Sequence, residues 1–313
     1  MKLLLPDSMP LHPALPDGVE AHGYDASRPL PDEHLDAEAL VVWGSSPEHL
    51  AAVAGRMPRL RWVQTLAAGP DAVLAAGFPD DVLVTSGSGL HDRPVAEHAL
   101  ALVLALVRRL PAAQVAQAEH RWADELGGLQ PLHPTGAVTT LLGARVLVWG
   151  FGRIGQTLAP MLRALGADVR GVGRSAGDRS GFPVVTEDEL EAELGRADVL
   201  VMILPSTAST AEALDARRLA ALPRHAHVVN VGRGSTVDEA ALVAALVDGG
   251  IAGAALDVTA VEPLPPDSAL WGAPNLLLTP HAAGGRPVGA DDLIATNAAA
   301  LLAGEQLRNV VER

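Results

Sequence analysis

Residues 144–155 read A-R-V-L-V-W-G-F-G-R-I-G, and much of the fold can be worked out from this stretch. It begins with a short apolar run at 146–149, which is typical of a parallel strand buried on both faces. Three glycines follow, and apolar residues then recur at helical spacing up to Leu165. A buried strand, a glycine turn and a helix in this order predict an anion site at the start of the helix.

Each glycine of the turn has its own reason to be there. Gly150 allows a tight turn, Gly152 lets a pyrophosphate approach the backbone, and Gly155 lets the helix pack closely on the strand. The alternative is a turn that binds nothing, which the flanking strand and helix disfavour. We therefore expect a dinucleotide here, held by Gly150, Phe151, Gly152, Arg153, Ile154 and Gly155.

The next expected strand, 169–172, indicates which dinucleotide binds. A site for NAD usually has an Asp or Glu about 20 residues past the glycines, where it holds the ribose 2′-hydroxyl. This chain has Gly173 there, followed by Arg174 and Ser175, and Arg179 is close in sequence. A guanidinium can pair with a 2′-phosphate that a carboxylate would repel. The sequence therefore favours NADP over NAD, with Arg174 and Ser175 as contacts; the alternative is that Arg174 is a solvated loop residue.

Composition limits the class of protein. The chain has 313 residues, 49% of them hydrophobic, which is enough for two domains with their own cores. The net charge of −14 and the lack of a basic patch argue against nucleic acid as a partner. There is no cysteine, so redox chemistry needs a bound cofactor. The apolar run at the start of the sequence is too short for a signal sequence, and the longest apolar run, 99–107, is too short for a membrane span. We therefore expect a soluble cytoplasmic protein with no membrane partner.

Strands alternate with helices in the first part of the chain, which predicts a small parallel α/β unit. The expected strands are 3–5, 39–43, 62–66 and 82–85, with helices at 47–56 and 67–76 and a Pro-, Asp- and Gly-rich connection up to about Asp36. A helix of different character follows, with Asp92 as its N-cap, and runs to about Arg109. Because it is apolar on nearly every side, we expect it to be buried all round, to join two domains and to contribute to a subunit interface.

A second α/β unit begins at Ala144. After the glycine loop, strands are expected at 169–172, 197–203, 227–231, 253–258 and 276–279, and helices at 237–247 and 292–303. Ligands of open parallel sheets bind at the carboxyl ends of the strands. Arg233, Asp257 and His281 each lie at or just after such an end, so they become candidate site residues.

Arg233, Glu262 and His281 together suit hydride transfer to a 2-keto acid. A cation must hold the carboxylate and polarise the keto group, and the planar fork of Arg233 suits this role. A proton donor must supply the alcohol proton, and His281 is the best-placed group that titrates near neutral pH. An acidic partner must keep the histidine protonated and oriented, as Glu262 can. Taken alone, each residue also has an ordinary structural explanation.

Two other kinds of site are disfavoured. His225 and His227 alternate on one strand face, but no carboxylate or third histidine stands beside them in sequence, so no metal is predicted. The stretch S-G-S-G at 86–89 lacks the spacing of a serine hydrolase elbow.

Several motifs in one order carry a resemblance to a known family. They are A-A-G-P-D at 67–71, P-V-A-E-H at 94–98, G-F-G-R-I-G at 150–155, I-L-P-S-T at 203–207, V-N-V-G-R-G at 229–234, A-L-D-V at 255–258, E-P-L-P at 262–265 and T-P-H-A-A-G at 279–284. With them, the sequence resembles the D-isomer-specific 2-hydroxyacid dehydrogenase family over nearly its whole length.

The resemblance implies an α/β fold with two Rossmann-like or flavodoxin-like parallel-sheet domains. Residues 1–91 and 285–313 would form a discontinuous substrate domain, and residues 92–284 a dinucleotide-binding domain inserted into it. Members of the family are usually homodimers built around the cofactor domain. The resemblance also implies catalysis by Arg233, Glu262 and His281 and substrate binding at Ala68 and Gly69. Further cofactor contacts are implied for Leu204, Pro205, Thr210, Val231, Gly232, Asp257 and Gly284, with Asp257 near the nicotinamide.

The implied function is an oxidoreductase that reduces a small 2-keto acid to a D-2-hydroxy acid, with NADPH-linked reduction of glyoxylate or hydroxypyruvate as the first choice. The missing acid after 169–172 agrees with the NADP-using reductases of this family, and the retained Glu262 argues against its formate dehydrogenases. The alternatives are an NAD-dependent D-2-hydroxyacid, phosphoglycerate or phosphite dehydrogenase, and a non-catalytic dinucleotide-sensing protein like the corepressors on this fold. The sequence does not define the side chain of the substrate.

Overall fold

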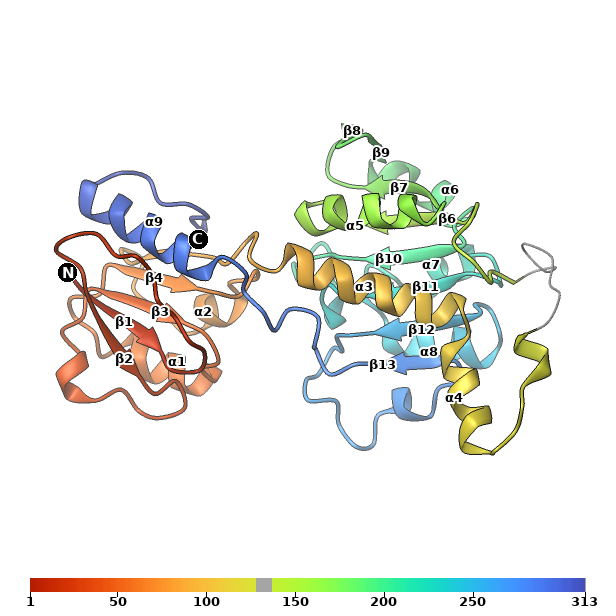
Figure 1. Cartoon of the computed structure of the whole chain (residues 1–313), viewed down its shortest axis with the longest axis horizontal. Helices are drawn as coiled ribbons and strands as arrows, with labels where there is room; N and C mark the ends of the chain where they lie inside the picture. The colour runs from red at the N-terminus through yellow and green to blue at the C-terminus, as the bar shows by residue number, and fades with distance from the viewer. Residues whose placement is uncertain (128–136, 313) are drawn as a thin grey trace. The chain divides into compact units, whose positions relative to one another are not determined.

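The computed structural model of the chain describes residues 1–127 and 137–312. The chain forms two compact units, the first made of Met1–His91 and Gly284–Arg313 and the second of Asp92–Ala283. Each unit is built around its own sheet, with helices packed on it (Figure 1). The expected class of fold, α/β with two parallel-sheet units, is confirmed.

The sheet of the first unit is parallel throughout, with the strand order β2-β1-β3-β4-β5 that is common in flavodoxin-like folds. Its strands are β1 (Lys2–Pro6), β2 (Glu20–Tyr24), β3 (Ala39–Val42), β4 (Trp62–Thr65) and β5 (Leu83–Thr85). Its helices are η1 (Asp32–His34), α1 (Pro47–Ala54), α2 (Asp71–Ala75) and, from the end of the chain, α9 (Ala290–Ala303). Neighbouring side chains of β1 divide the core, because Leu4 packs with residues of α1 and Leu3 packs with residues of α9.

Strand β2 corrects a prediction made from the sequence. It lies in the connection for which the sequence predicts no strand, and it forms the edge of the sheet beside β1. It reads E-A-H-G-Y, and Tyr24 is its one buried residue. An edge strand with so little burial has no apolar alternation, so its sequence carries no periodic signal.

The sheet of the second unit has the order β13-β12-β11-β10-β6-β7-β9-β8 within the described residues. Its strands are β6 (Arg145–Trp149), β7 (Asp168–Val172), β8 (Gly177–Arg179), β9 (Phe182–Val185), β10 (Val199–Met202), β11 (His227–Asn230), β12 (Gly253–Leu256) and β13 (Leu276–Leu278). All neighbours are parallel except β8 and β9. The chain winds outward from β6 in both directions, first through β7 and then through β10. The loops after β6 and β10 therefore diverge, which is where open α/β sheets bind ligands.

Helices cover both faces of this second sheet. Helices α3 (Asp92–Val107) and α5 (Arg153–Ala164) share one core cluster with the sheet. A second core cluster contains residues of the sheet and of three other helices, α6 (Leu190–Leu194), α7 (Ala216–Ala221) and α8 (Glu239–Val247) (Figure 1). Helix α4 (Leu110–Ala118) follows α3, and short 3-10 turns form at η2 (Asp124–Leu126), η3 (Glu187–Glu189), η4 (Gly234–Thr236) and η5 (Ala269–Gly272).

Helix α3 corrects two further predictions. Asp92 is the first residue of the helix rather than its N-cap, and its carboxylate lies 2.9 Å from the Arg153 guanidinium. The helix is also not buried all round, because Leu100 and Leu104 are only partly buried against the core. In the described part of the chain no single helix is long and apolar enough to cross a membrane; α3 and α4 meet that test only as a pair, bent by 63° at the break between them.

Candidate active site

The glycine loop joins β6 to α5, and its three glycines differ in their surroundings. Gly150 has a φ of +99°, and a Cβ atom there would lie 2.5 Å from the carbonyl oxygen of Ile203. A Cβ on Gly155 would lie 3.2 Å from Val148 of the preceding strand, whereas a Cβ on Gly152 would meet nothing within 4 Å. The first glycine thus makes the turn, the third allows close packing, and the second leaves open space at the start of α5, as a dinucleotide requires.

A cavity of about 820 Å³ opens beside this loop. Its size is within the range of ligand sites in proteins. Of the predicted cofactor contacts, it is lined by Gly150, Phe151, Gly152, Arg174, Leu204, Pro205 and Thr210. The predicted contacts outside its lining are Arg153, Ile154, Gly155, Ser175, Val231, Gly232, Asp257 and Gly284, the last of which belongs to the first unit. The cavity therefore gathers the loops after β6, β7 and β10, as expected for the switch point of the sheet.

The two arginines after β7 are used differently. Arg179 donates to the carbonyl oxygen of Phe151 at 3.0 Å and to both oxygens of Ser175 at 2.8 Å. A Cβ atom on Gly173 would lie 2.8 Å from this guanidinium, so the glycine makes room for it. Arg174 lines the cavity and is exposed, and its guanidinium has no hydrogen bond or ion pair with any described residue. Arg174 is therefore the cation that a ligand in the cavity can engage.

Glu187 and Asp188 also line the cavity, and the sequence interpretation missed them. They follow β9, which forms a hairpin with β8 that the sequence interpretation likewise missed. The apolar F-P-V-V run of β9 directly before an acidic stretch is the signal that could have placed them at a strand end.

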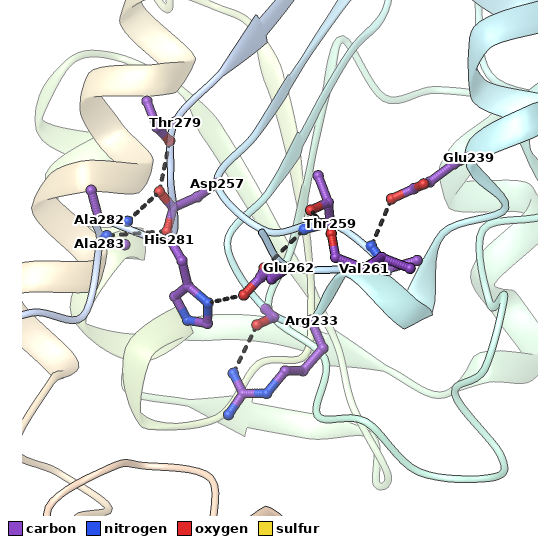
Figure 2. A network of polar contacts seen from close by, with 12 residues as sticks. Arg233, Glu239, Asp257, Thr259, Val261, Glu262, Thr279, His281, Ala282 and Ala283 are labelled. Atoms are coloured by element: carbon purple, nitrogen blue, oxygen red, sulfur yellow. Dashed lines mark hydrogen bonds and ion pairs between the residues drawn. The ribbon is translucent and has the colours of Figure 1, made fainter. Parts of the chain in front are cut away.

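His281 and Glu262 form a close pair in the second unit. The His281 Nδ1 atom lies 2.7 Å from Glu262 Oε2, and both side chains are partly open to solvent (Figure 2). His281 follows β13 with a φ of +50°, and its backbone N–H donates to the carbonyl oxygen of Asp257 at 2.8 Å. The other oxygen of Glu262 accepts from the backbone N–H of Thr259 at 3.0 Å. The carboxylate is thus fixed on one side and faces the imidazole on the other.

Asp257 lies next to the backbone of His281 and is only 1% exposed. Its Oδ1 atom accepts from the Thr279 hydroxyl at 2.6 Å and from the Ala282 N–H at 2.9 Å, and it lies 3.1 Å from His98 Nε2. Its Oδ2 atom accepts from the Ala283 N–H at 3.1 Å. These contacts tie down the segment on either side of His281, so Asp257 holds the loop of the histidine (Figure 2).

Arg233 follows β11 and has a firmly held backbone. Its carbonyl oxygen accepts from Asn230 Nδ2 at 3.1 Å and from the Thr236 hydroxyl at 2.6 Å. Its Nη1 atom donates to the carbonyl oxygen of Gly232 at 2.9 Å. Figure 2 shows the Arg233 side chain extending to the same side of the network as the His281 ring. The second unit therefore brings together the three residues predicted to carry the chemistry.

Ala68 and Gly69 belong to the first unit, in the turn between β4 and α2. The turn is held at its start, because His91 Nε2 donates to the carbonyl oxygen of Leu66 at 2.7 Å and the Gly87 N–H donates to that of Ala67 at 2.7 Å. Among the described residues, no acceptor lies opposite the backbone N–H groups of Ala68 and Gly69. Two adjacent amides of this kind can receive a carboxylate.

His225 and His227 take structural positions. His225 Nε2 lies 2.8 Å from Asp198, which also pairs with Arg145. His227 is 8% exposed, and its burial, with a smaller contribution from His225, lowers its pKa to about 4. Across residues 1–127 and 137–312, no group of three or more His, Asp or Glu side chains could hold a metal ion.

Known proteins are similar to this chain in sequence and in fold. The family model described as "D-isomer specific 2-hydroxyacid dehydrogenase, NAD binding domain" matches residues 100–283. A solved structure of a D-isomer specific 2-hydroxyacid dehydrogenase from Xanthobacter autotrophicus Py2, in complex with NADPH and MES, is 33% identical with a TM-score of 0.78. The alignment covers 99% of this chain and 97% of that one.

Two curated relatives carry different names. Glyoxylate/hydroxypyruvate reductase A of Salmonella paratyphi B is 35% identical over 289 residues, which are 88% of this chain and 86% of the relative. D-3-phosphoglycerate dehydrogenase of Mycobacterium tuberculosis is 35% identical over 278 residues, which are 86% of this chain but 49% of the relative. The chain thus spans about half of the length of the second relative and most of the first.

Proposed function

Because the chain belongs to the D-isomer specific 2-hydroxyacid dehydrogenase family, we propose that it reduces a small 2-keto acid to a D-2-hydroxy acid with a nicotinamide dinucleotide. The observation that carries this proposal is the contact of 2.7 Å between His281 Nδ1 and Glu262 Oε2. It supplies an oriented acid in the same unit as the dinucleotide cavity. We assign the second unit to the cofactor and the first to the substrate.

His281 is the proton donor in this scheme. When bound, the reduced dinucleotide supplies a hydride to the carbonyl carbon of the keto acid. The carboxylate of Glu262 accepts the hydrogen bond from Nδ1, so this nitrogen keeps its proton. Nε2 is left to give a proton to the carbonyl oxygen as it gains charge. The contact with Glu262 also fixes the orientation of the imidazole ring.

Arg233 in the second unit and the turn at Ala68 and Gly69 in the first each carry donors that suit a substrate carboxylate. A guanidinium can donate two parallel hydrogen bonds to a carboxylate, which fixes the position of the adjacent keto group. The backbone amides of Ala68 and Gly69 supply further donors. Each unit thus offers its own donors to a carboxylate, which favours a substrate with a carboxylate beside its keto group.

We further propose NADPH as the preferred cofactor. Arg174 lines the cavity with an unengaged guanidinium, and no carboxylate takes the place that usually holds a 2′-hydroxyl at the end of β7. The glycine loop, Leu204, Pro205 and Thr210 would hold the rest of the dinucleotide, since they line the same cavity. The similar Xanthobacter protein was solved with NADPH, which supports this assignment.

Glyoxylate and hydroxypyruvate are the proposed substrates, because the relative that this chain covers over 86% of its length is a glyoxylate/hydroxypyruvate reductase. A second candidate is NAD-dependent oxidation of 3-phosphoglycerate, which the similar mycobacterial protein favours. The second candidate is the weaker choice, because this chain covers only 49% of the length of that relative.

One assay separates these candidates. Oxidation of NADPH and NADH is followed with glyoxylate, hydroxypyruvate, pyruvate and phenylpyruvate, and reduction of NAD and NADP with 3-phosphoglycerate. We expect turnover with NADPH on glyoxylate or hydroxypyruvate. Turnover with 3-phosphoglycerate and NAD alone would replace this proposal with the second candidate, and tight dinucleotide binding without any turnover would point to a sensor.

We also propose that the protein is a homodimer in which a second copy covers α3 and α4. Leu110 and Val115 of α4 are about half exposed, at 50% and 58%, and Leu100 and Leu104 of α3 are only partly buried. Aliphatic side chains exposed on two consecutive helices can be covered by another apolar surface.

A further inference from the structure

The loop that carries Glu262 is held from outside by a residue that none of the motifs includes. Glu239 is the first residue of α8, and its Oε1 atom accepts from the backbone N–H of Ala260 at 2.7 Å (Figure 2). Capping does not explain this carboxylate, because Asp238 is the N-cap of α8 and accepts from the Ala241 N–H at 3.0 Å. Glu239 therefore uses its side chain to reach across to another loop.

The loop between Asp257 and Glu262 has little freedom once Ala260 is held. A Cβ atom on Gly234 would overlap the backbone of Thr259, so the loop lies directly against the turn that follows Arg233. The Thr259 N–H donates to Glu262 Oε1 at 3.0 Å, and the Thr259 hydroxyl donates to the Val261 carbonyl at 2.9 Å. Ala260 lies between these contacts, so its bond to Glu239 fixes the segment on which the Glu262 carboxylate depends.

We propose that Glu239 is a positioning residue for the pair formed by Glu262 and His281. Its carboxylate holds the loop so that Glu262 Oε2 stays 2.7 Å from His281 Nδ1. The kinetic part of this inference rests on the proposed function, in which that pair delivers the proton. A misplacement of about 1 Å at a reacting group can lower the rate about 10²-fold, so a hydrogen bond this far from the chemistry can still control turnover.

Two substitutions separate the effect of the length of the Glu239 side chain from the effect of its charge. E239D keeps the negative charge in the first turn of α8 but shortens the side chain by one methylene, so it should lose the bond to Ala260. E239Q loses the charge but keeps an oxygen acceptor at the same reach. E191D is the matched control, because Glu191 lies in the first turn of α6 in the same unit and pairs with Arg217 rather than with a loop of the site.

We expect E239D to lower kcat about 10²-fold while the KM for NADPH stays unchanged, and E239Q and E191D to stay close to wild type. Hydrogen–deuterium exchange should show the Ala260 amide losing protection in E239D but not in E239Q or E191D.

A wild-type kcat in E239D would overturn the inference. So would an E239Q variant as impaired as E239D while the Ala260 amide stays protected, because the charge and not the bond would then matter. These outcomes differ from failure of the proposed function, which would appear as a wild-type protein without turnover on any keto acid. In that case amide exchange alone decides whether Glu239 holds the loop, and unchanged exchange in E239D would overturn it.

Discussion

His281 carries the most direct prediction. Substitution H281A should lower kcat about 10²- to 10⁴-fold, the usual contribution of a general acid. Dinucleotide affinity should stay unchanged, because His281 does not line the dinucleotide cavity. Steady-state kinetics and a fluorescence titration with NADPH measure the two quantities. E262Q should give a smaller loss, since the imidazole remains. An H281A variant with wild-type kcat would remove His281 as the acid.

Arg174 should decide the choice of cofactor. In R174D a carboxylate replaces the unengaged guanidinium, so a 2′-phosphate loses a partner and gains a repulsive neighbour. One charge-assisted hydrogen bond of about 1.5 kcal/mol corresponds to about tenfold in affinity, so KM for NADPH should rise at least about tenfold. KM for NADH should change less. R196D, at another exposed arginine of the same unit, is the control. An unchanged ratio of the two KM values would contradict the role of Arg174 in binding the 2′-phosphate.

His227 makes stability depend on pH. Burial, and to a smaller extent His225, lowers its pKa to about 4 from 6.5, so the folded protein favours the neutral ring. Its stabilising contribution is complete above pH 6.5 and is lost as pH falls from 6.5 toward 4, by at most about 3 kcal/mol. Denaturant unfolding at several pH values should show that the free energy of unfolding falls less with decreasing pH in H227L than in the wild type. Parallel curves would mean that His227 does not contribute, because Asp198, whose pKa is also lowered, remains in both proteins.

The site residues that the sequence could predict are those at the ends of buried strands. Arg233 and His281 follow short, mostly apolar strands, β11 and β13, so their place at the carboxyl edge of the sheet follows from the pattern. Glu239 could not be found in this way, because an acid in the first turn of a helix is common for its interaction with the helix dipole alone. Its bond to Ala260 depends on how two loops meet in space. Glu187 and Asp188 could have been found, because the apolar F-P-V-V run of β9 directly precedes them.

At the scale of elements, the strand–turn–helix unit predicts opposite effects for two of its glycines. G152A should leave the melting temperature nearly unchanged, since a Cβ there meets nothing within 4 Å, but it should weaken dinucleotide binding by blocking close approach. G150A should instead lower stability by about 1–3 kcal/mol or more, because of the φ of +99° and the clash with Ile203. Thermal melting and NADPH titration of both variants check this. Equal melting temperatures would contradict the assigned roles.

Burial separates most of the strands that the sequence predicts from those that it does not, and the mostly buried strand β9 is an exception. Strands β3, β4, β6 and β10 are almost wholly buried, and the sequence predicts the ends of all four to within two residues. Strands β2 and β8 are edge strands with mostly exposed side chains, and neither was expected. An edge strand is defined by backbone pairing with its neighbour, which a one-dimensional apolar pattern does not record.

At the scale of the whole molecule, the chain forms two mostly parallel sheets with different strand orders. The first sheet places its substrate candidates, Ala68 and Gly69, after β4, and the second places the cofactor loop and the acid pair at the carboxyl ends of β6 to β13. Parallel sheets gather loops from distant parts of the sequence at one edge. This is why Arg233, Glu262 and His281, which are separated by 29 and 19 residues in sequence, meet in one network.

The apolar surface of α3 and α4 leads to the prediction about assembly. We expect light scattering after size exclusion to give twice the chain mass of 32.3 kDa. The double variant L110E/V115E should be monomeric, because two buried, unpaired carboxylates at an interface cost far more than the apolar contact contributes. L302E, at an exposed leucine of α9 in the other unit, is the control and should stay dimeric. A wild-type protein of 32.3 kDa, or a dimer that survives L110E/V115E, would show that a second copy does not cover these helices.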